Sequence, residues 1–175
     1  MKETGNSVPP AIILPGTKVL SAAIDRIKVV GTMSATNIDP SLIPDSGDWY
    51  WPTLRTYYIS SPFAWRSGVF HEAIDITGTG YGSPIFAANN GIVYKVYYDY
   101  IGGYQIIIAH SSNIYTMYAH LASQAVTAGQ TVTRGQKIGT MGSTGMSTGT
   151  HLHFASYVGI PLRGGTPFNP MSLYR

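Results

Sequence analysis

The sequence of 175 residues contains no cysteine and few charged residues, and each shortage excludes a class of protein. Without cysteine there are no disulfides, thiolate zinc sites or cysteine nucleophiles, so catalysis must rely on histidine, carboxylates, hydroxyls or a metal that they hold. Charged residues make up 11% of the chain and hydrophobic residues 44%, whereas ordinary soluble proteins have about 25% charged residues. A disordered chain would need high charge and few aromatic residues, so we expect a folded domain.

Long hydrophobic runs and clusters of basic residues are also missing. No apolar run approaches the roughly 20 residues that span a bilayer, and the stretch 9–16 is too short and too rich in proline for a secretory signal. Eleven Lys and Arg against eight Asp and Glu give a formal net charge of +3, without a basic run that would form a stripe for nucleic acid. We expect neither a transmembrane segment nor a nucleic-acid partner, and the sequence shows no route of delivery.

Turn-forming residues divide the chain into two unequal parts. Up to about residue 51, prolines and an Asp-Ser-Gly-Asp stretch recur at short intervals, which is typical of an extension. Within this part, residues 20–30 fit a helix and a short strand equally well. We predict an irregular N-terminal extension or linker at 1–51, which would dock on an additional domain or on a virion or cell-wall partner, and a single domain at 52–175.

From residue 53 onward, short β-type runs are separated by Gly, Asn and Ser, and no helix longer than two turns is expected. The clearest runs lie at 91–100, 104–110, 113–120, 137–141 and 151–158. The first three of these five runs are predicted to pair as sequential antiparallel neighbours. The segment 142–150 holds eight small residues and one Met, which predicts a mobile loop. The fold class is therefore mainly β, a small antiparallel β-sheet or β-sandwich.

All five histidines of the chain lie in the β half, and two pairs among them and the carboxylates point to a metal site. His151 and His153 share a face in an extended chain, as do His71 and Asp75. Neutral imidazole and carboxylate suit Zn²⁺, and catalytic zinc sites use three protein ligands with an open position for water. Each pair alone is a weak signal, but together they indicate one metal centre built from distant segments.

Three stretches of the sequence resemble the signatures of the M23 peptidases, the LytM/lysostaphin-like zinc metalloendopeptidases. They are Phe70-His-Glu-Ala-Ile-Asp75, Met117-Tyr-Ala-His-Leu121 and His151-Leu-His153. The resemblance runs from about residue 51 to 174 and includes the stretch 61–66. It implies an antiparallel β fold with an open groove.

The resemblance also implies the roles of individual residues. Zn²⁺ would be held by His71, Asp75 and His153. His120 and His151 would be the catalytic pair that orients or deprotonates water and stabilises the oxyanion, with the division of these roles between the two left open.

The activity that the resemblance implies is zinc-dependent hydrolysis of peptide bonds in the stems or cross-links of bacterial peptidoglycan, for lysis or remodelling of the cell wall. Such an enzyme would act in the extracellular or periplasmic cell wall or as part of a phage virion, and the sequence does not select the bond that is cut. Ala64 and Ala73 stand where the family usually has Gly, which bears on the fit of the groove rather than on its chemistry.

Other interpretations remain beside this one. The stretch 145–149 matches the serine motif G-x-S-x-G, but a strand rather than a helix follows it. The stretch 126–139 is similar to the turns of lipoyl-type barrels, yet no lysine is found at an exposed hairpin tip. A noncatalytic M23-fold assembly or hydrolase-activator protein is the main alternative, although such relatives typically lack metal ligands. Single residues also have ordinary explanations: we expect Glu72 to be solvated and His110 to be a surface or hydrogen-bonded core residue.

Overall fold

The computed structural model describes residues 38–40, 43–45 and 47–175. The unassigned segment at 20–30 and most of the predicted extension lie outside the described residues. The described chain is built of short and long strands: β1 (Tyr58–Ser61), β2 (Trp65–Arg66), β3 (Val69–Phe70), β4 (Ile74–Thr77), β5 (Pro84–Phe86), β6 (Gly91–Asp99), β7 (Gly103–Ala109), β8 (Ile114–Gln124), β9 (Thr131–Val132), β10 (Lys137–Met141), β11 (Leu152–Val158) and β12 (Thr166–Phe168).

From residue 47 onward, helical structure is limited to the short 3₁₀ turns η3 (Ser111–Asn113), η4 (Pro161–Arg163) and η5 (Pro170–Tyr174). None of the described helices has the length and apolar character required to cross a membrane.

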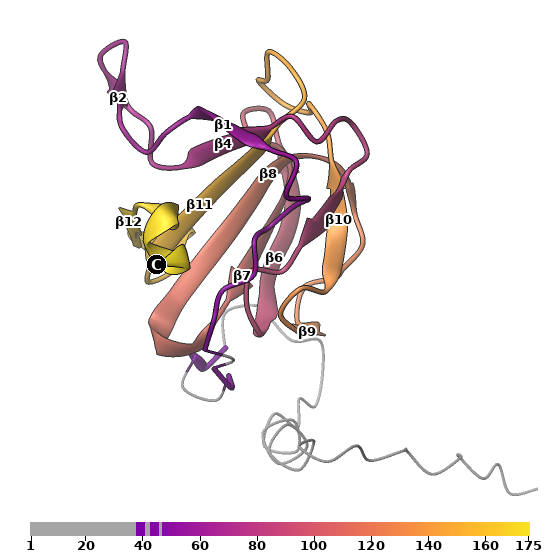
Figure 1. Ribbon diagram of the computed structural model, residues 1–175. Helices are drawn as coiled ribbons and strands as arrows, with labels where there is room; N and C mark the ends of the chain where they lie inside the picture. The colour runs from indigo at the N-terminus through magenta and orange to yellow at the C-terminus, as the bar shows by residue number, and fades with distance from the viewer. Residues whose placement is uncertain (1–37, 41–42, 46) are drawn as a thin grey trace, which may run out of the picture. The chain divides into compact units, whose positions relative to one another are not determined.

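Ten of the described strands form one sheet, whose main path is β1-β4-β11-β8-β7-β6-β9. β10 joins this path through β8, β5 joins through β10, and β12 joins through β11. Every pairing in the sheet is antiparallel. β2 and β3 form a separate hairpin that projects beyond β1 (Figure 1, purple). The mainly antiparallel β fold predicted from the sequence is confirmed.

The long strands agree closely with the sequence pattern. β10 has the predicted bounds, and β6, β7 and β8 pair in sequential antiparallel order, side by side in Figure 1. β8 continues past the predicted end at His120 to Gln124. This extra length arises because Leu121, Ser123 and Gln124 pair with β10, a long-range contact that local alternation does not reveal.

One face of the sheet carries the hydrophobic core. Facing positions on the neighbouring strands β4, β11, β8 and β7 hold large apolar side chains, which are almost completely buried and belong to one cluster: Ile74, Phe154, Tyr118 and Ile106. Full burial of such a side chain contributes about 1.5–3 kcal/mol. The core therefore fixes the register of these four strands, because a slip by one residue would turn each side chain to the opposite face.

The opposite face of the same strands carries a row of polar side chains, called here the polar row. Asp75 of β4 is the partner of His153 of β11, and His153 is the partner of Ala119 of β8. Gln105 of β7 and its partner Tyr97 of β6 continue the row. The register that the core sets on one face thus lines up the polar side chains on the other.

Residues close to the predicted boundary at 51 pack against this core. Trp51 is 4% exposed and stacks on Tyr57 with ring centroids 4.3 Å apart. The backbone N–H of Tyr50 donates to the Ala88 carbonyl at 2.8 Å, and Ile43 is also buried. The ring of Tyr50 also contacts Phe86 of β5, with ring centroids 5.6 Å apart, so this segment extends the core beside β5.

Candidate metal centre

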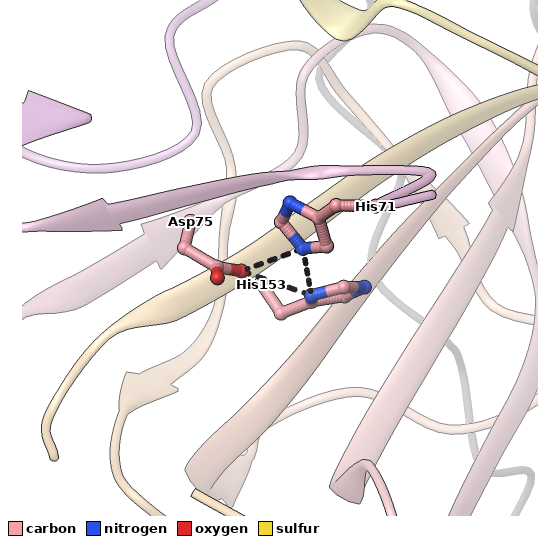
Figure 2. A group of neighbouring side chains, drawn as sticks. All are labelled: His71, Asp75 and His153. Carbon is pink, nitrogen blue, oxygen red and sulfur yellow. Dashed lines mark hydrogen bonds and ion pairs between the residues drawn. The ribbon is translucent and has the colours of Figure 1, made fainter. Parts of the chain in front are cut away.

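Three side chains from distant parts of the sequence converge at one point of the polar row (Figure 2). Asp75 and His153 face each other across the β4–β11 pair, and His71 comes from the segment between β3 and β4. The His71 Nε2 atom lies 3.3 Å from both Asp75 Oδ1 and His153 Nδ1. His153 Nδ1 lies 3.0 Å from Asp75 Oδ1. The structure therefore brings the three predicted ligands together.

The route by which His71 reaches this point differs from the prediction. The alternation argument placed His71 and Asp75 on one strand, but β4 begins only at Ile74, and His71 lies in an irregular segment with a bend at Ala73. That expectation is wrong for His71, because its position is set by contacts with another segment. Its backbone N–H donates to the Ala64 carbonyl at 2.9 Å.

The donor set fits a zinc ion. With metal–ligand bonds of about 2.0–2.1 Å, two donors of a tetrahedral zinc site lie about 3.3–3.4 Å apart. The three donor atoms of His71, Asp75 and His153 lie 3.0 to 3.3 Å from one another, close to this spacing. Lone pairs that converge so closely repel one another unless a cation or a proton lies between them. The arrangement therefore suits a tetrahedral cation with three protein ligands.

The ring of His71 is fixed by a main-chain carbonyl. His71 Nδ1 lies 3.0 Å from the Pro62 carbonyl oxygen, and a carbonyl only accepts hydrogen bonds. The Nδ1 proton therefore points to Pro62, and the lone pair of the neutral ring is at Nε2, which faces the other two donors. His71 is 4% exposed, so the ring cannot turn into solvent.

Asp75 divides its two oxygens between different partners. Oδ1 faces His71 and His153, while Oδ2 accepts a hydrogen bond from Arg66 Nη1 at 3.2 Å. Burial by itself raises the pKa of the Asp75 carboxyl, but the hydrogen bonds and charges of His153 and His71 outweigh it and hold that pKa well below its usual range. Asp75 is therefore ionised, as a metal ligand would have to be. Arg66 was given no role from the sequence, although it lies within the family-like stretch 61–66.

His120 and His151 stand beside the three donors, with ring centroids 4.6 Å apart. His151 Nδ1 lies 2.8 Å from the Gly149 carbonyl, and its Nε2 lies 3.8 Å from Asp75 Oδ1. His120 Nδ1 lies 2.8 Å from the Thr144 carbonyl. Each ring therefore donates its Nδ1 proton to a main-chain carbonyl and keeps a lone pair at Nε2 in its neutral form.

The environment of His120 favours the neutral ring. Burial lowers the pKa of His120, and the neighbouring His151 and His153 lower it further, while the Thr144 carbonyl partly opposes the shift. His120 also has a backbone φ of 59°, in the left-handed region that residues other than Gly seldom adopt. Such strain at a residue beside a polar cluster is typical of functional sites.

The loop that contributes the Thr144 carbonyl is held more firmly than the sequence suggested. The Thr144 hydroxyl donates to the Leu121 carbonyl at 2.6 Å and accepts from the Tyr104 N–H at 3.1 Å. The prediction of a loop with little fixed packing is therefore wrong for its first half, where polar contacts replace apolar area. In the second half, Met146 is 63% exposed.

Other sequence expectations are met by the surroundings. Glu72 is exposed, as predicted. His110 is fully buried and hydrogen-bonded, with Nδ1 2.8 Å from the Asn90 carbonyl and Nε2 2.7 Å from the Thr116 hydroxyl, so of the two alternatives left open by the sequence it is the core residue. Ala73 does not have a positive φ, so its methyl group is accommodated without backbone strain.

The serine motif is not arranged as a nucleophile. Ser147 Oγ donates to the Gly149 carbonyl at 2.7 Å and lies 3.4 Å from His151 Nδ1. That nitrogen already directs its proton to Gly149, so it cannot accept the hydroxyl proton. The segment is followed by β11 rather than by a helix, in agreement with the sequence argument.

Comparison with known proteins agrees with this fold and site. The sequence model described as "Peptidase family M23" matches residues 69–170, more than half of the chain. The peptidoglycan DD-endopeptidase ShyC of Vibrio cholerae is 44% identical over 81 residues, which are 44% of this chain and 19% of ShyC. This chain spans less than a third of the first curated relatives that it matches.

Solved structures give the same result. A zinc-containing peptidase from Vibrio cholerae is 33% identical with a TM-score of 0.64, over 74% of this chain and 40% of that one. Lysostaphin from Staphylococcus simulans is 28% identical with a TM-score of 0.64, over 73% of this chain and 52% of that one. The fold is that of the LytM/lysostaphin-like peptidases. The chain belongs to peptidase family M23.

Proposed function

We propose that this chain is a zinc-dependent endopeptidase that hydrolyses peptide bonds in the stems or cross-links of bacterial peptidoglycan. The observation that carries the proposal is the convergence of His71 Nε2, Asp75 Oδ1 and His153 Nδ1 at the spacing of a tetrahedral zinc site. The relative ShyC is a peptidoglycan DD-endopeptidase, which supports this class of substrate. A noncatalytic role is not favoured, since no ligand position is lost.

His71, Asp75 and His153 would hold the metal. A zinc ion supplies Lewis-acid polarisation of a carbonyl and activates water near neutral pH. The chain supports this chemistry from outside the ligand set: Pro62 fixes the ring of His71, and Arg66 holds the second oxygen of Asp75. Such supporting contacts keep ligands in one orientation and raise metal affinity.

His120 and His151 would manage the protons of the reaction. Each directs its Nδ1 proton to a carbonyl, so that only Nε2 is able to accept or return a proton. A neutral ring suits a general base, and the protonated ring formed afterwards suits stabilisation of the oxyanion and delivery of the proton to the leaving amine. The pair therefore has the two functions that amide hydrolysis requires.

We also propose that residues 52–175 form the catalytic domain, with Ile43, Tyr50 and Trp51 packed against it, and that the remainder of residues 1–51 serves as an extension toward a cell-wall or virion partner. The expected place of action is the cell wall or periplasm, where peptide cross-links occur. The curated relatives are longer than this chain, so the proposal concerns the catalytic unit and not the activity of a whole relative.

The test is zinc content measured beside the initial rate of peptidoglycan hydrolysis for single-residue variants. His71→Ala, Asp75→Ala and His153→Ala should lose zinc and activity together. His120→Ala and His151→Ala should keep zinc, while turnover falls by about 10²–10⁴. Mass spectrometry of the released muropeptides then identifies the bond that is cut.

Two control variants sharpen the test. Glu72→Gln changes an exposed carboxylate next to His71 and should alter neither zinc nor rate. Ser147→Ala should also leave turnover intact, because Ser147 is not placed as a nucleophile. Undiminished hydrolysis by a wild-type protein without bound metal would refute the proposal, as would release of zinc by His120→Ala.

A further inference from the structure

Two pockets adjoin the candidate metal centre at different places along the sheet. One has a volume of about 380 Å³, lies beside β1 and β4, and is lined by Arg66, Asp75 and His151 among others. The other has a volume of about 280 Å³, lies beside β6, β7 and β8, and is lined by His120 and His153 among others. A peptide that crosses the metal centre would place its two sides in these two pockets.

The two pockets differ in charge. The larger pocket contains the guanidinium of Arg66, which is about half exposed. The smaller pocket, called here the Asp99 pocket, has Asp99 as the only carboxylate among its lining residues and contains no Lys or Arg. In the larger pocket the Arg66 cation is paired with the Asp75 carboxylate at 3.2 Å, whereas the carboxylate in the Asp99 pocket has no lining cation beside it, so a cationic group on a substrate is attracted there.

The carboxylate of Asp99 keeps its charge within this pocket. Its Oδ1 accepts from the backbone N–H groups of Ile101 and Gly102 at 2.9 and 2.7 Å, and its Oδ2 accepts from Gln105 Nε2 at 2.7 Å. These donors are neutral, and no ion pair to Asp99 occurs in the part of the chain that the structure describes. The contacts fix the position of the carboxylate without neutralising it.

The rest of the pocket is built to hold that position. Gln105 is 4% exposed, and its side-chain oxygen accepts a hydrogen bond from the Tyr97 hydroxyl at 3.0 Å. Tyr97, Gln105 and Asp99 thus form one hydrogen-bonded row on the polar side of β6 and β7, leading from the pocket floor to its rim. A fixed carboxylate without an ion-pair partner is a suitable site for an ammonium group.

We propose that the Asp99 pocket binds a primary ammonium group carried by the peptide substrate and that Asp99 is the residue that selects for it. This inference rests on the proposed function and specifies the substrate class further: a stem or cross-link peptide with a free side-chain amine near the bond that is cut. The overall net charge of +3 does not attract such a group, so the selection is local.

Lys95 already places its ammonium group over the ring of Tyr97. Its Nζ lies 4.4 Å from the centroid of the Tyr97 ring. Lys95 does not line the Asp99 pocket, and it forms no ion pair with Asp99. The carboxylate therefore stays available to the substrate while the ring is already shared with a cation.

The experiment compares two substrates and three proteins. The substrates are cross-linked muropeptide dimers with a free side-chain amine and the same dimers after acetylation of that amine. The proteins are the zinc-loaded wild type, Asp99→Asn, and the control Asp48→Asn, which removes the same charge from an exposed residue that lines neither pocket. Asn keeps an oxygen for the N–H groups of Ile101 and Gly102, and thermal melting checks that the hairpin is retained.

We expect acetylation to lower kcat/KM of the wild type by about ten-fold, the scale of one hydrogen bond to a charged group. Asp99→Asn should show the same loss on the free-amine dimer and less than a two-fold change on the acetylated dimer, so that the two effects are not additive. Asp48→Asn should behave as the wild type. The effect of acetylation on the wild type and the effect of Asp99→Asn on the free-amine dimer should both become smaller as the salt concentration rises.

Equal losses on both dimers in Asp99→Asn would overturn the inference, because they would show a purely structural role. Equal kcat/KM of the wild type on the free-amine and acetylated dimers would overturn it as well. If the wild type cleaves neither dimer, the proposed function fails, and binding of the two dimers to the same zinc-loaded proteins decides this inference separately. It stands if Asp99→Asn weakens binding of the free-amine dimer alone, and it falls if the variant binds both dimers as the wild type does.

Discussion

The buried histidine outside the candidate site should make the stability of the protein depend on pH. His110 is fully buried, and burial lowers its pKa from 6.5 to about 4, although the Asn90 carbonyl and the charge of Asp45 favour the protonated ring. In the unfolded chain the same residue titrates near its ordinary value. As pH falls from 6.5 toward 4, His110 binds a proton in the unfolded chain but not in the folded protein, so the free energy of unfolding falls.

The size of this effect follows from the two pKa values. The full difference of pKa corresponds to about 3 kcal/mol, reached below pH 4, and about 2 kcal/mol of it is already lost at pH 5 relative to pH 7.5. Above pH 6.5 the contribution is fully present and does not change further. The prediction is therefore restricted to the window between pH 6.5 and 4, on the acid side of neutrality.

Urea unfolding of the wild type and of His110→Gln at pH 7.5 and pH 5 measures the effect. His110→Gln should be less stable at pH 7.5, but its loss of stability on going to pH 5 should be about 2 kcal/mol smaller than that of the wild type. Because the other histidines titrate in both proteins, the difference between the two losses isolates His110.

A matched variant separates titration from packing. Thr116→Val removes the hydroxyl that lies 2.7 Å from His110 Nε2 and 3.0 Å from the Tyr118 hydroxyl, and it should cost about 1–3 kcal/mol at either pH, because buried polar groups lose a hydrogen-bond partner. It leaves a titratable ring in place, so its dependence on pH should stay close to that of the wild type. Identical pH dependence in the wild type and His110→Gln would refute the reasoning.

Two further predictions concern packing beside the site. Trp51→Ala should lower the free energy of unfolding by about 3–5 kcal/mol, since Trp51 is 4% exposed in the core; a loss below 1 kcal/mol in urea unfolding would show that the segment around it does not belong to the folded domain. Thr144→Val removes both hydrogen bonds of the Thr144 hydroxyl and should cost about 1–3 kcal/mol. It should also slow turnover with zinc retained, because Thr144 carries the carbonyl that orients His120, and unchanged stability and rate would contradict this.

The sequence predicts the strands of this fold well because their signal is local. The alternation of apolar and polar residues defines β6, β7 and β11 to within about two residues, and the antiparallel order of β6, β7 and β8 follows from their short connections. The separate hairpin of β2 and β3 has no such signal, since each strand has only two residues. The pairing of β8 with β10 is likewise invisible, because it joins segments far apart in sequence.

Local patterns indicated two residue pairs at one metal centre, and the resemblance to the M23 signatures implied the ligands His71, Asp75 and His153, but the groups that orient these side chains were not predicted. The Pro62, Thr144 and Gly149 carbonyls fix the rings of three different histidines. Every residue carries a main-chain carbonyl, so nothing in the side-chain sequence distinguishes these three from the others. Arg66 and Asp99 were visible as charges, but only the folded chain shows which atoms they reach.

The position of His120 shows how an irregularity of the sheet places a functional side chain. Strict alternation along β8 would put His120 on the same face as Tyr118, which is in the core. The pairing with β7 instead skips from Leu121–Tyr104 to Tyr118–Ile106, so that two residues of β8 lie opposite the single residue Gln105.

This β-bulge, with its positive φ at His120, returns Leu121 to the core and turns His120 to the polar face beside His153. The strained backbone costs about 1–3 kcal/mol. Several contacts hold it: the His120 N–H donates to the Gly102 carbonyl at 2.7 Å, and the ring is held by the Thr144 carbonyl. The bulge therefore links the loop at Thr144 and the β6–β7 hairpin to the position of one histidine ring.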